Sequence, residues 1–96
     1  MYPAELVITL EPTGRHLAFR KEPLEKANVY RRVFGRGSAW ELIALNAPSP
    51  FLDAEPFQPG TTLEYHVQHL TQQDSYLGHS LILRLTLSGL PGFAPR

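Results

Sequence analysis

The segment formed by residues 51–67 constrains the fold more than any other part of the chain. It contains a short apolar run at residues 51–53, a Pro59-Gly60 corner, and then a stretch in which every second residue is apolar: Leu63, Tyr65 and Val67. Alternation with a period of two is typical of a strand with one face in a core, and a proline–glycine pair turns the chain between strands. The segment therefore predicts that the chain passes here from one sheet of a β-sandwich to the other.

The same alternation, interrupted by turn residues, predicts seven short strands. They cover residues 5–11, 16–21, 28–34, 40–44, 51–53, 62–70 and 80–87. Residues 24–32 contain good helix formers, but their apolar spacing is poor and Pro23 precedes them, so we expect at most one helical turn there. Residues 71–79 are expected to form a polar loop. The prediction is an all-β fold, a seven-stranded antiparallel β-sandwich over residues 1–88, followed by a Pro/Gly-rich tail or linker at residues 89–96.

Composition limits the class of protein. With 96 residues, of which 43% are apolar and 19% charged, the chain suits one domain with a buried core. Nine Lys and Arg residues balance nine Asp and Glu residues. A net charge of zero argues against a nucleic-acid partner, because such binding depends on neutralising phosphates. Residues 1–36 hold seven basic and four acidic residues, and residues 37–96 hold two basic and five acidic ones. The two parts therefore carry +3 and −3, and we expect these charges to pair inside the domain.

Features that the sequence lacks argue against disulfides, thiolate metal sites, a signal peptide and a membrane helix. There is no cysteine, which removes disulfides and thiolate metal sites. The N-terminus lacks the basic and apolar regions of a signal peptide, so synthesis in the cytoplasm is expected, and an extracellular location only for a fragment of a larger protein. The longest apolar runs are far shorter than the ~20 residues of a membrane helix, so no membrane insertion is expected.

Five short motifs resemble those of a fibronectin type III domain in its bacterial style, an immunoglobulin-like sandwich. Val29-Tyr30-Arg31-Arg32 followed by a Gly-rich turn and residues 40–44 is similar to the family's C–C′ hairpin. Residues 51–53 are similar to the end of its strand E, residues 57–61 to its E–F corner, Tyr65-His66-Val67 to its strand F, and Gly78-His79-Ser80 to the start of its strand G. The resemblance implies a module that holds or joins other molecules rather than an enzyme.

Two positions depart from the family pattern. Leu63 occupies the place of the usual corner tyrosine, so we expect apolar packing around Phe57 and Leu63, rather than a hydroxyl bond, to hold the crossing between the sheets. Lys21 occupies the place of the usual tryptophan of the second strand. Trp40 or Tyr65 is expected to supply part of that core volume.

The histidines do not predict a metal site. His66 and His69 are three residues apart on one predicted strand, so they face opposite sides and cannot chelate one ion together. Solvated or edge positions are expected for the four histidines. Asp74, Ser75 and His79 are residue types of a hydrolase triad, but no nucleophile elbow or glycine-built oxyanion site surrounds them. We predict no catalytic residues, no metal and no cofactor.

Three arginines around the predicted hairpin have two interpretations. In the first, Arg31, Arg32 and Arg36 bind an acidic protein, a phosphate or a sialylated glycan through bidentate hydrogen bonds. Alternatively, their stems pack over aromatic rings such as Tyr30 and Trp40 while alternate side chains remain in solvent. We favour the structural interpretation and keep the three residues as candidate contacts, with a glycan as the weaker ligand.

Apolar residues in predicted loops are further candidates for partner contacts. Tyr76 and Leu77 are predicted at the tip of the polar loop, where burial within the domain is hard to arrange, and tyrosine is favoured at interfaces. Leu90 and Phe93 lie in the tail, where docking on a neighbouring subunit would bury them. A linker to another domain explains the composition of the tail equally well.

The favoured function is a non-enzymatic structural or adhesive module with a protein partner. We expect a subunit of a larger assembly, such as a phage virion, where it would be a capsid decoration or tail protein that contacts capsid or tail subunits or its own copies. The alternative is a spacer or carbohydrate-associated accessory domain from a larger secreted enzyme or surface protein. The genomic neighbourhood of the reading frame would separate these possibilities.

Overall fold

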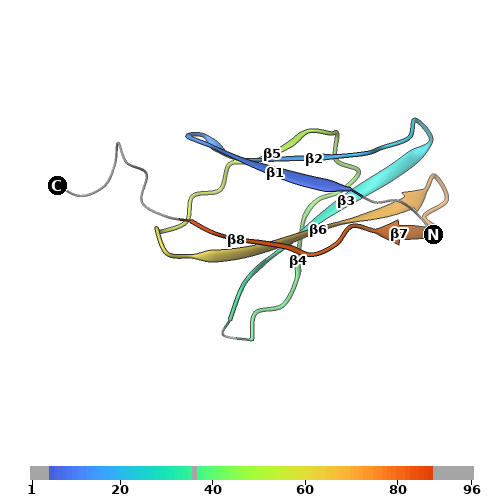
Figure 1. The fold of residues 1–96 in the computed structure, drawn as a ribbon. Helices are drawn as coiled ribbons and strands as arrows, with labels where there is room; N and C mark the ends of the chain where they lie inside the picture. Colours follow the sequence, from blue (N-terminus) through green and yellow to red (C-terminus); the bar gives the residue numbers. More distant parts are fainter. Residues whose placement is uncertain (1–4, 36, 88–96) are drawn as a thin grey trace.

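The structure is a computed structural model that describes residues 5–35 and 37–87. Within these residues the chain forms eight strands and no helix (Figure 1). They are β1 (Leu6–Glu11), β2 (Gly14–Phe19), β3 (Glu25–Val33), β4 (Glu41–Ala44), β5 (Phe51–Asp53), β6 (Thr62–Thr71), β7 (Tyr76–His79) and β8 (Leu83–Thr86). The predicted tail with Leu90 and Phe93 lies outside the described residues, and so does Arg36.

The strands form two antiparallel sheets. One has three strands in the order β1-β2-β5, and the other has five, in which β4, β3, β6 and β7 follow one another and β8 also pairs with β6. The longest ladder joins β3 to β6, from Glu25 opposite Thr71 to Val33 opposite Leu63. The prediction of an all-β fold built from antiparallel strands is therefore confirmed.

Two of the predicted elements differ in the structure. Residues 76–79 form β7 and pair with β6, whereas we predicted a polar loop through residue 79. β3 begins at Glu25, so most of the segment considered for a helical turn belongs to the longest ladder. In both cases pairing with β6 supplies backbone hydrogen bonds that local residue preferences do not reveal.

A β-bulge at residues 80–82 separates β7 from β8. Gln68 lies opposite His79 and Tyr65 lies opposite Leu83, so the outer strand contains one extra residue between these pairs. The buried hydroxyl of Ser80 accepts a hydrogen bond of 2.9 Å from the backbone amide of Val67, and the Ser80 amide donates to the Val67 carbonyl. The strand predicted at residues 80–87 is thus present only from Leu83, beyond the bulge.

Contacts between the sheets give the order in which the strands face each other. On β2, Arg15 reaches Tyr65 and Phe19 packs against His69, so β2 lies over β6 and runs in the same direction. Arg31 of β3 reaches Asp53 of β5. Consequently β1 is on the same side of the sandwich as β7 and β8, while β4 and β5 are on the opposite side.

The core lies between the sheets and is formed by the residues that alternation pointed inward. Leu63, Tyr65 and Val67 of β6 are fully buried, as predicted, together with Leu17 and Val29. Tyr65 supplies core volume as expected, whereas Trp40 lies on the outer side of the five-stranded sheet, beside His66. His69 is also fully buried, which corrects the expectation that the histidines are solvated or at an edge.

Candidate functional site

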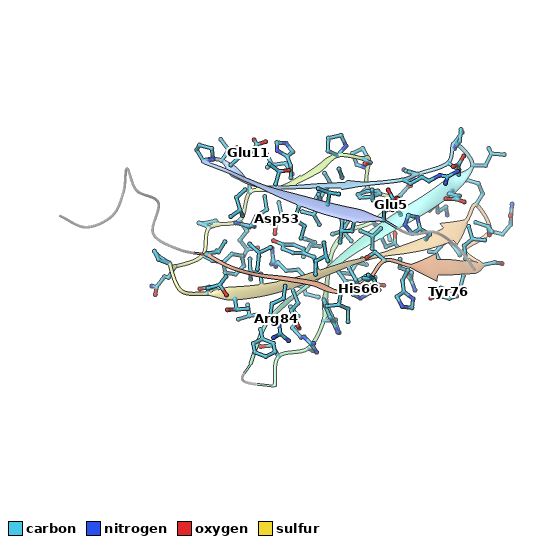
Figure 2. All side chains as sticks on the ribbon, viewed as in Figure 1. Glu5, Glu11, Asp53, His66, Tyr76 and Arg84 are labelled. Atoms are coloured by element: carbon cyan, nitrogen blue, oxygen red, sulfur yellow. The ribbon has the colours of Figure 1, made fainter. Side chains whose placement is uncertain are left out.

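A charged cluster occupies the interior where the sheets cross. Asp53 is at the end of β5, and Figure 2 shows it between the two sheets. Its Oδ2 accepts a hydrogen bond of 2.5 Å from the Tyr65 hydroxyl and lies 3.1 Å from Nη2 of Arg15. Nη1 of Arg31 donates to both Asp53 oxygens at 3.0 Å. Side chains from β2, β3, β5 and β6 therefore meet at one carboxylate.

Further groups complete the cluster around the two arginines. Arg15 donates from Nε to the Tyr65 hydroxyl at 2.8 Å and from Nη2 to the carbonyl of Glu55 at 2.7 Å. Arg31 donates from Nη2 to carboxylate oxygens of Glu41 and Glu55. Both guanidinium groups also lie near the Phe57 ring, 5.4 Å and 4.9 Å from its centroid. Two guanidinium groups and three carboxylates leave one negative charge in excess, and it lies toward the exposed side chains of Glu41 and Glu55.

The surroundings shift the acid–base behaviour of the cluster. Burial alone would raise the pKa of Asp53, but hydrogen bonds from Tyr65, Arg31 and Arg15 outweigh it and hold that pKa below its ordinary value. Burial raises the pKa of Tyr65 far above its ordinary value, and the negative charge of Asp53 adds to the effect. Burial works against the charge of Arg31, yet hydrogen bonding to Asp53 keeps its pKa raised. Asp53 remains ionised and Tyr65 neutral across the physiological pH range.

This cluster holds the fold together and presents no ligand site. Arg31 is buried and its donors point to Asp53, Glu41 and Glu55, so we remove it from the candidate partner contacts. The hydroxyl of Tyr65 bridges β6 and β5. This bond corrects the expectation that apolar packing around Phe57 and Leu63 holds the crossing without a hydroxyl. This bond could have been anticipated from the sequence, because Tyr65 lies two residues after Leu63 and therefore on the same inward face of the strand.

The outer side of the five-stranded sheet carries a continuous row of aromatic and arginine side chains. We call it the aromatic–arginine face and define it by its members: Tyr30, Arg32 and Phe34 from β3 and its end, Trp40 before β4, Glu64 and His66 from β6, and Arg84 from β8. Figure 2 shows Arg84 beyond the five-stranded sheet, on the side away from Asp53.

Glu64 organises one half of this face. Its Oε1 accepts hydrogen bonds of 2.9 Å and 2.6 Å from Arg32, and its Oε2 accepts two from Arg84 at 3.1 Å and 3.0 Å. The guanidinium of Arg32 lies 4.4 Å from the centroid of a Trp40 ring, and that of Arg84 lies 3.7 Å from the centroid of Phe34. The hydrogen bonds from Arg32, opposed by burial and reinforced by Arg84, lower the pKa of Glu64. Two arginines around one carboxylate leave one positive charge in excess.

Histidine and tyrosine rings form the other half. His66 is stacked on Tyr30, with ring centroids 4.9 Å apart and planes 7° from parallel, and it meets Trp40 edge-on at 4.5 Å. His79 of β7 lies 6.2 Å from His66, and its Nδ1 is hydrogen-bonded to the hydroxyl of Tyr76. Burial lowers the pKa of His66, and the nearby His79 and Arg32 lower it further. His66 is therefore neutral at physiological pH and acts here as an aromatic ring.

Within the described residues, those predicted to contact a partner do not all lie together on one surface patch. Arg32 stacks on Trp40, as the structural interpretation of the arginines predicted. Tyr76 is exposed and Leu77 half-buried, but both belong to strand β7 rather than to a loop tip. Trp40, Glu64, His66 and Arg84 were not predicted as site residues. Period-two alternation on β6 could have placed Glu64 and His66 on one outer face together with Tyr30 and Arg32 of the neighbouring strand.

The described residues show no arrangement typical of a metal or catalytic site. Within them no group of three or more histidine or acidic side chains is placed to hold a metal ion. Asp74 pairs with Lys26, and His79 contacts Tyr76 and His66, so Asp74, Ser75 and His79 do not form a triad. None of the described residues belongs to a helix of the length and apolarity that crossing a bilayer requires. The chain matches no known family model, no curated protein and no solved structure.

Proposed function

We propose that this domain is a non-enzymatic module that binds a protein partner through the aromatic–arginine face and so joins a larger assembly. The observation that carries the proposal is the composition of that face. Tryptophan, tyrosine and arginine dominate the energetics of protein interfaces, and here they lie together on the outer side of one sheet. Phe34, a member of the face, is exposed, and exposed Leu42, which lies opposite Tyr30 on β4, extends the apolar part of the face.

The arrangement of the face supports a protein partner better than a glycan. A sugar needs an open ring face on which to stack. Here Arg32 lies over the indole of Trp40, and Tyr30 is stacked on His66, so the rings already contact one another. The excess positive charge near Arg84 suits an acidic residue at the rim of a protein partner. We therefore place the carbohydrate-associated accessory domain second.

The strand order supports a fibronectin type III-like identity as part of the same proposal. Three strands on one sheet face a second sheet in the order β4-β3-β6 followed by β7 and β8. If β7 and β8 count as one strand interrupted by the bulge at residues 80–82, the domain has seven strands. Modules of this kind serve as adhesive or structural units. A phage capsid decoration or tail protein is one such unit that this proposal includes.

Site-specific photo-crosslinking in cells that contain the native partner tests the proposed function. A photoreactive phenylalanine analogue at Leu42 or Phe34, on the aromatic–arginine face, should give a discrete protein adduct. The matched control carries the analogue at Leu52, which is exposed on the three-stranded sheet, and should give none. Adducts from Leu52 alone, or from no position on the face, would overturn the proposal.

A further inference from the structure

Within residues 5–35 and 37–87, one side of the sandwich leaves two sheet edges without a partner strand. β1 ends the three-stranded sheet and β7 and β8 end the five-stranded sheet, and all three lie on the same side. On the opposite side, β4 and β5 are only four and three residues long, and Pro50 and Pro56 flank β5 closely. Short strands and prolines are common protections of a sheet edge. On the side formed by β1, β7 and β8, the strands β7 and β8 are as short as β4, but β1 has six residues and no proline lies within residues 5–11 or 76–87.

Large apolar side chains are exposed along the same side. Ten large hydrophobic residues are exposed in the part of the chain that the structure describes, and five of them belong to β1, β7 or the bulge: Val7, Leu10, Tyr76, Leu81 and Ile82. Leu81 and Ile82 are adjacent in sequence, with 79% and 53% of their surfaces exposed. In a regular strand, one of two adjacent side chains would point into the core. The bulge at residues 80–82 leaves both Leu81 and Ile82 exposed. An unpaired edge with exposed aliphatic residues is a template for association with another chain.

The charges on the two edges favour pairing of unlike edges. Residues 5–11 contain Glu5 and Glu11 and no basic residue, whereas residues 76–87 contain Arg84 and no acidic residue. Pairing β1 with β1, or β8 with β8, would bring like charges together, which is destabilising across a ladder. Pairing β1 of one copy with β8 of another brings opposite charges together.

The strand directions allow both unlike pairs to form at once. β2 and β6 run in the same direction, β1 is antiparallel to β2, and β8 is antiparallel to β6, so β1 and β8 are parallel. A two-fold axis parallel to the strands keeps their direction and exchanges the two sheet layers. It therefore places β1 of each copy beside β8 of the other and closes the assembly at two subunits.

We propose that two copies of this chain form a symmetric dimer in which β1 of each copy extends the five-stranded sheet of the other along β8. The exposed Val7, Leu81 and Ile82 are buried at the seams, and Arg84 comes near the acidic residues of β1. The inference goes beyond the proposed function. Arg84, at the border of the aromatic–arginine face, lies at the seam, whereas Tyr30, Arg32 and Trp40 lie on or near β3 and β4, away from the seam, and remain open in the dimer.

Sedimentation equilibrium of the full chain, from micromolar to millimolar concentrations, tests the dimer. We expect a reversible monomer–dimer equilibrium. Ile82→Lys places a charge at the seam and should raise the dissociation constant by about tenfold or more. Leu45→Lys, an equally drastic change at an exposed leucine that follows β4 on the opposite side, should leave it unchanged. Urea unfolding of both variants checks that they remain folded.

Cysteine cross-linking tests the pairing of β1 with β8. Because the chain contains no native cysteine, only the introduced cysteines can react. A mixture of Thr9→Cys and Ile82→Cys proteins, treated with a short bismaleimide, should give more mixed dimer than either variant gives alone. Thr9→Cys mixed with Leu45→Cys is the control and should give only background. A monomer at every concentration would overturn the dimer and leave the edge to a strand of another protein, while the photo-crosslinking result at Leu42 would be unaffected. A dimer broken by Leu45→Lys but not by Ile82→Lys would also overturn it.

Discussion

The hydroxyl of Tyr65 donates a hydrogen bond of 2.5 Å to Oδ2 of Asp53, and both side chains are buried. Tyr65 belongs to β6 and Asp53 to β5, so this single bond joins the two sheets at their crossing. Arg15 and Arg31 then bind the same carboxylate from β2 and β3. One aspartate thereby couples four strands.

Removing the Tyr65 hydroxyl should weaken the fold without creating a large cavity. Tyr65→Phe removes one of the buried donors to Asp53 and leaves the Nε of Arg15 without its acceptor, so we expect a loss of about 1–3 kcal/mol in the free energy of unfolding. Urea denaturation measures it. Tyr30→Phe is the control, because the Tyr30 hydroxyl makes one long bond of 3.3 Å to Gln68 and its loss should cost little. Equal losses in the two variants would contradict the role given to Tyr65.

Neutralising Asp53 should have a larger effect. Asp53→Asn leaves two buried guanidinium groups without their shared counter-ion, and breaking a buried pair in this way costs about 3–5 kcal/mol. The control is Asp74→Asn, which removes an exposed pair with Lys26 worth about 0–1 kcal/mol. Urea unfolding of both variants measures the difference. A stable Asp53→Asn protein would show that the arginines retain enough solvent to remain charged without Asp53.

The sequence predicted the inward face of β6 and the position of β5, because alternation is a local signal and Leu63, Tyr65 and Val67 follow it closely. It did not predict that Arg31, on an alternating strand, points inward to a carboxylate 22 residues later. Nor did it predict β7, since Tyr76 and Gly78 acquire strand geometry only by pairing with β6. The aromatic–arginine face was missed for a similar reason: Glu64 and Arg84 are 20 residues apart and meet only through the register of β6 and β8.

Gly14 tests how closely β2 and β5, which are neighbours in the three-stranded sheet, approach each other. A Cβ added at Gly14 would lie 2.4 Å from the carbonyl oxygen of Asp53, and its φ of 146° is rarely adopted by other residues. We expect Gly14→Ala to lower the free energy of unfolding by about 2–4 kcal/mol, through backbone strain and displacement of β5. Gly60→Ala is the control, because its φ of 92° is also strained but the space around it is open. A larger loss at Gly60 than at Gly14, measured by urea denaturation, would contradict the close approach.

The buried histidine predicts how stability depends on pH. Burial lowers the pKa of His69 below its ordinary value of 6.5, with the nearby Glu25 acting in the opposite direction, and burial also lowers the pKa of His66. Below pH 6.5 the unfolded chain therefore binds more protons than the folded domain. The free energy of unfolding should fall as the pH decreases through 6.5 and should level off above it.

The contribution of His69 can be isolated by substitution. His69→Leu places an apolar side chain of similar size against Phe19 and removes the titrating imidazole. The free energy of unfolding should therefore fall less in this variant than in the original protein as the pH decreases below 6.5. Val67→Ala is the control, since it destabilises the same strand without removing a proton-binding group and should keep the pH dependence of the original protein. Urea denaturation at a series of pH values measures both. If His69→Leu retained the full pH dependence, the titrating group would be His66, on the outer face of the sheet.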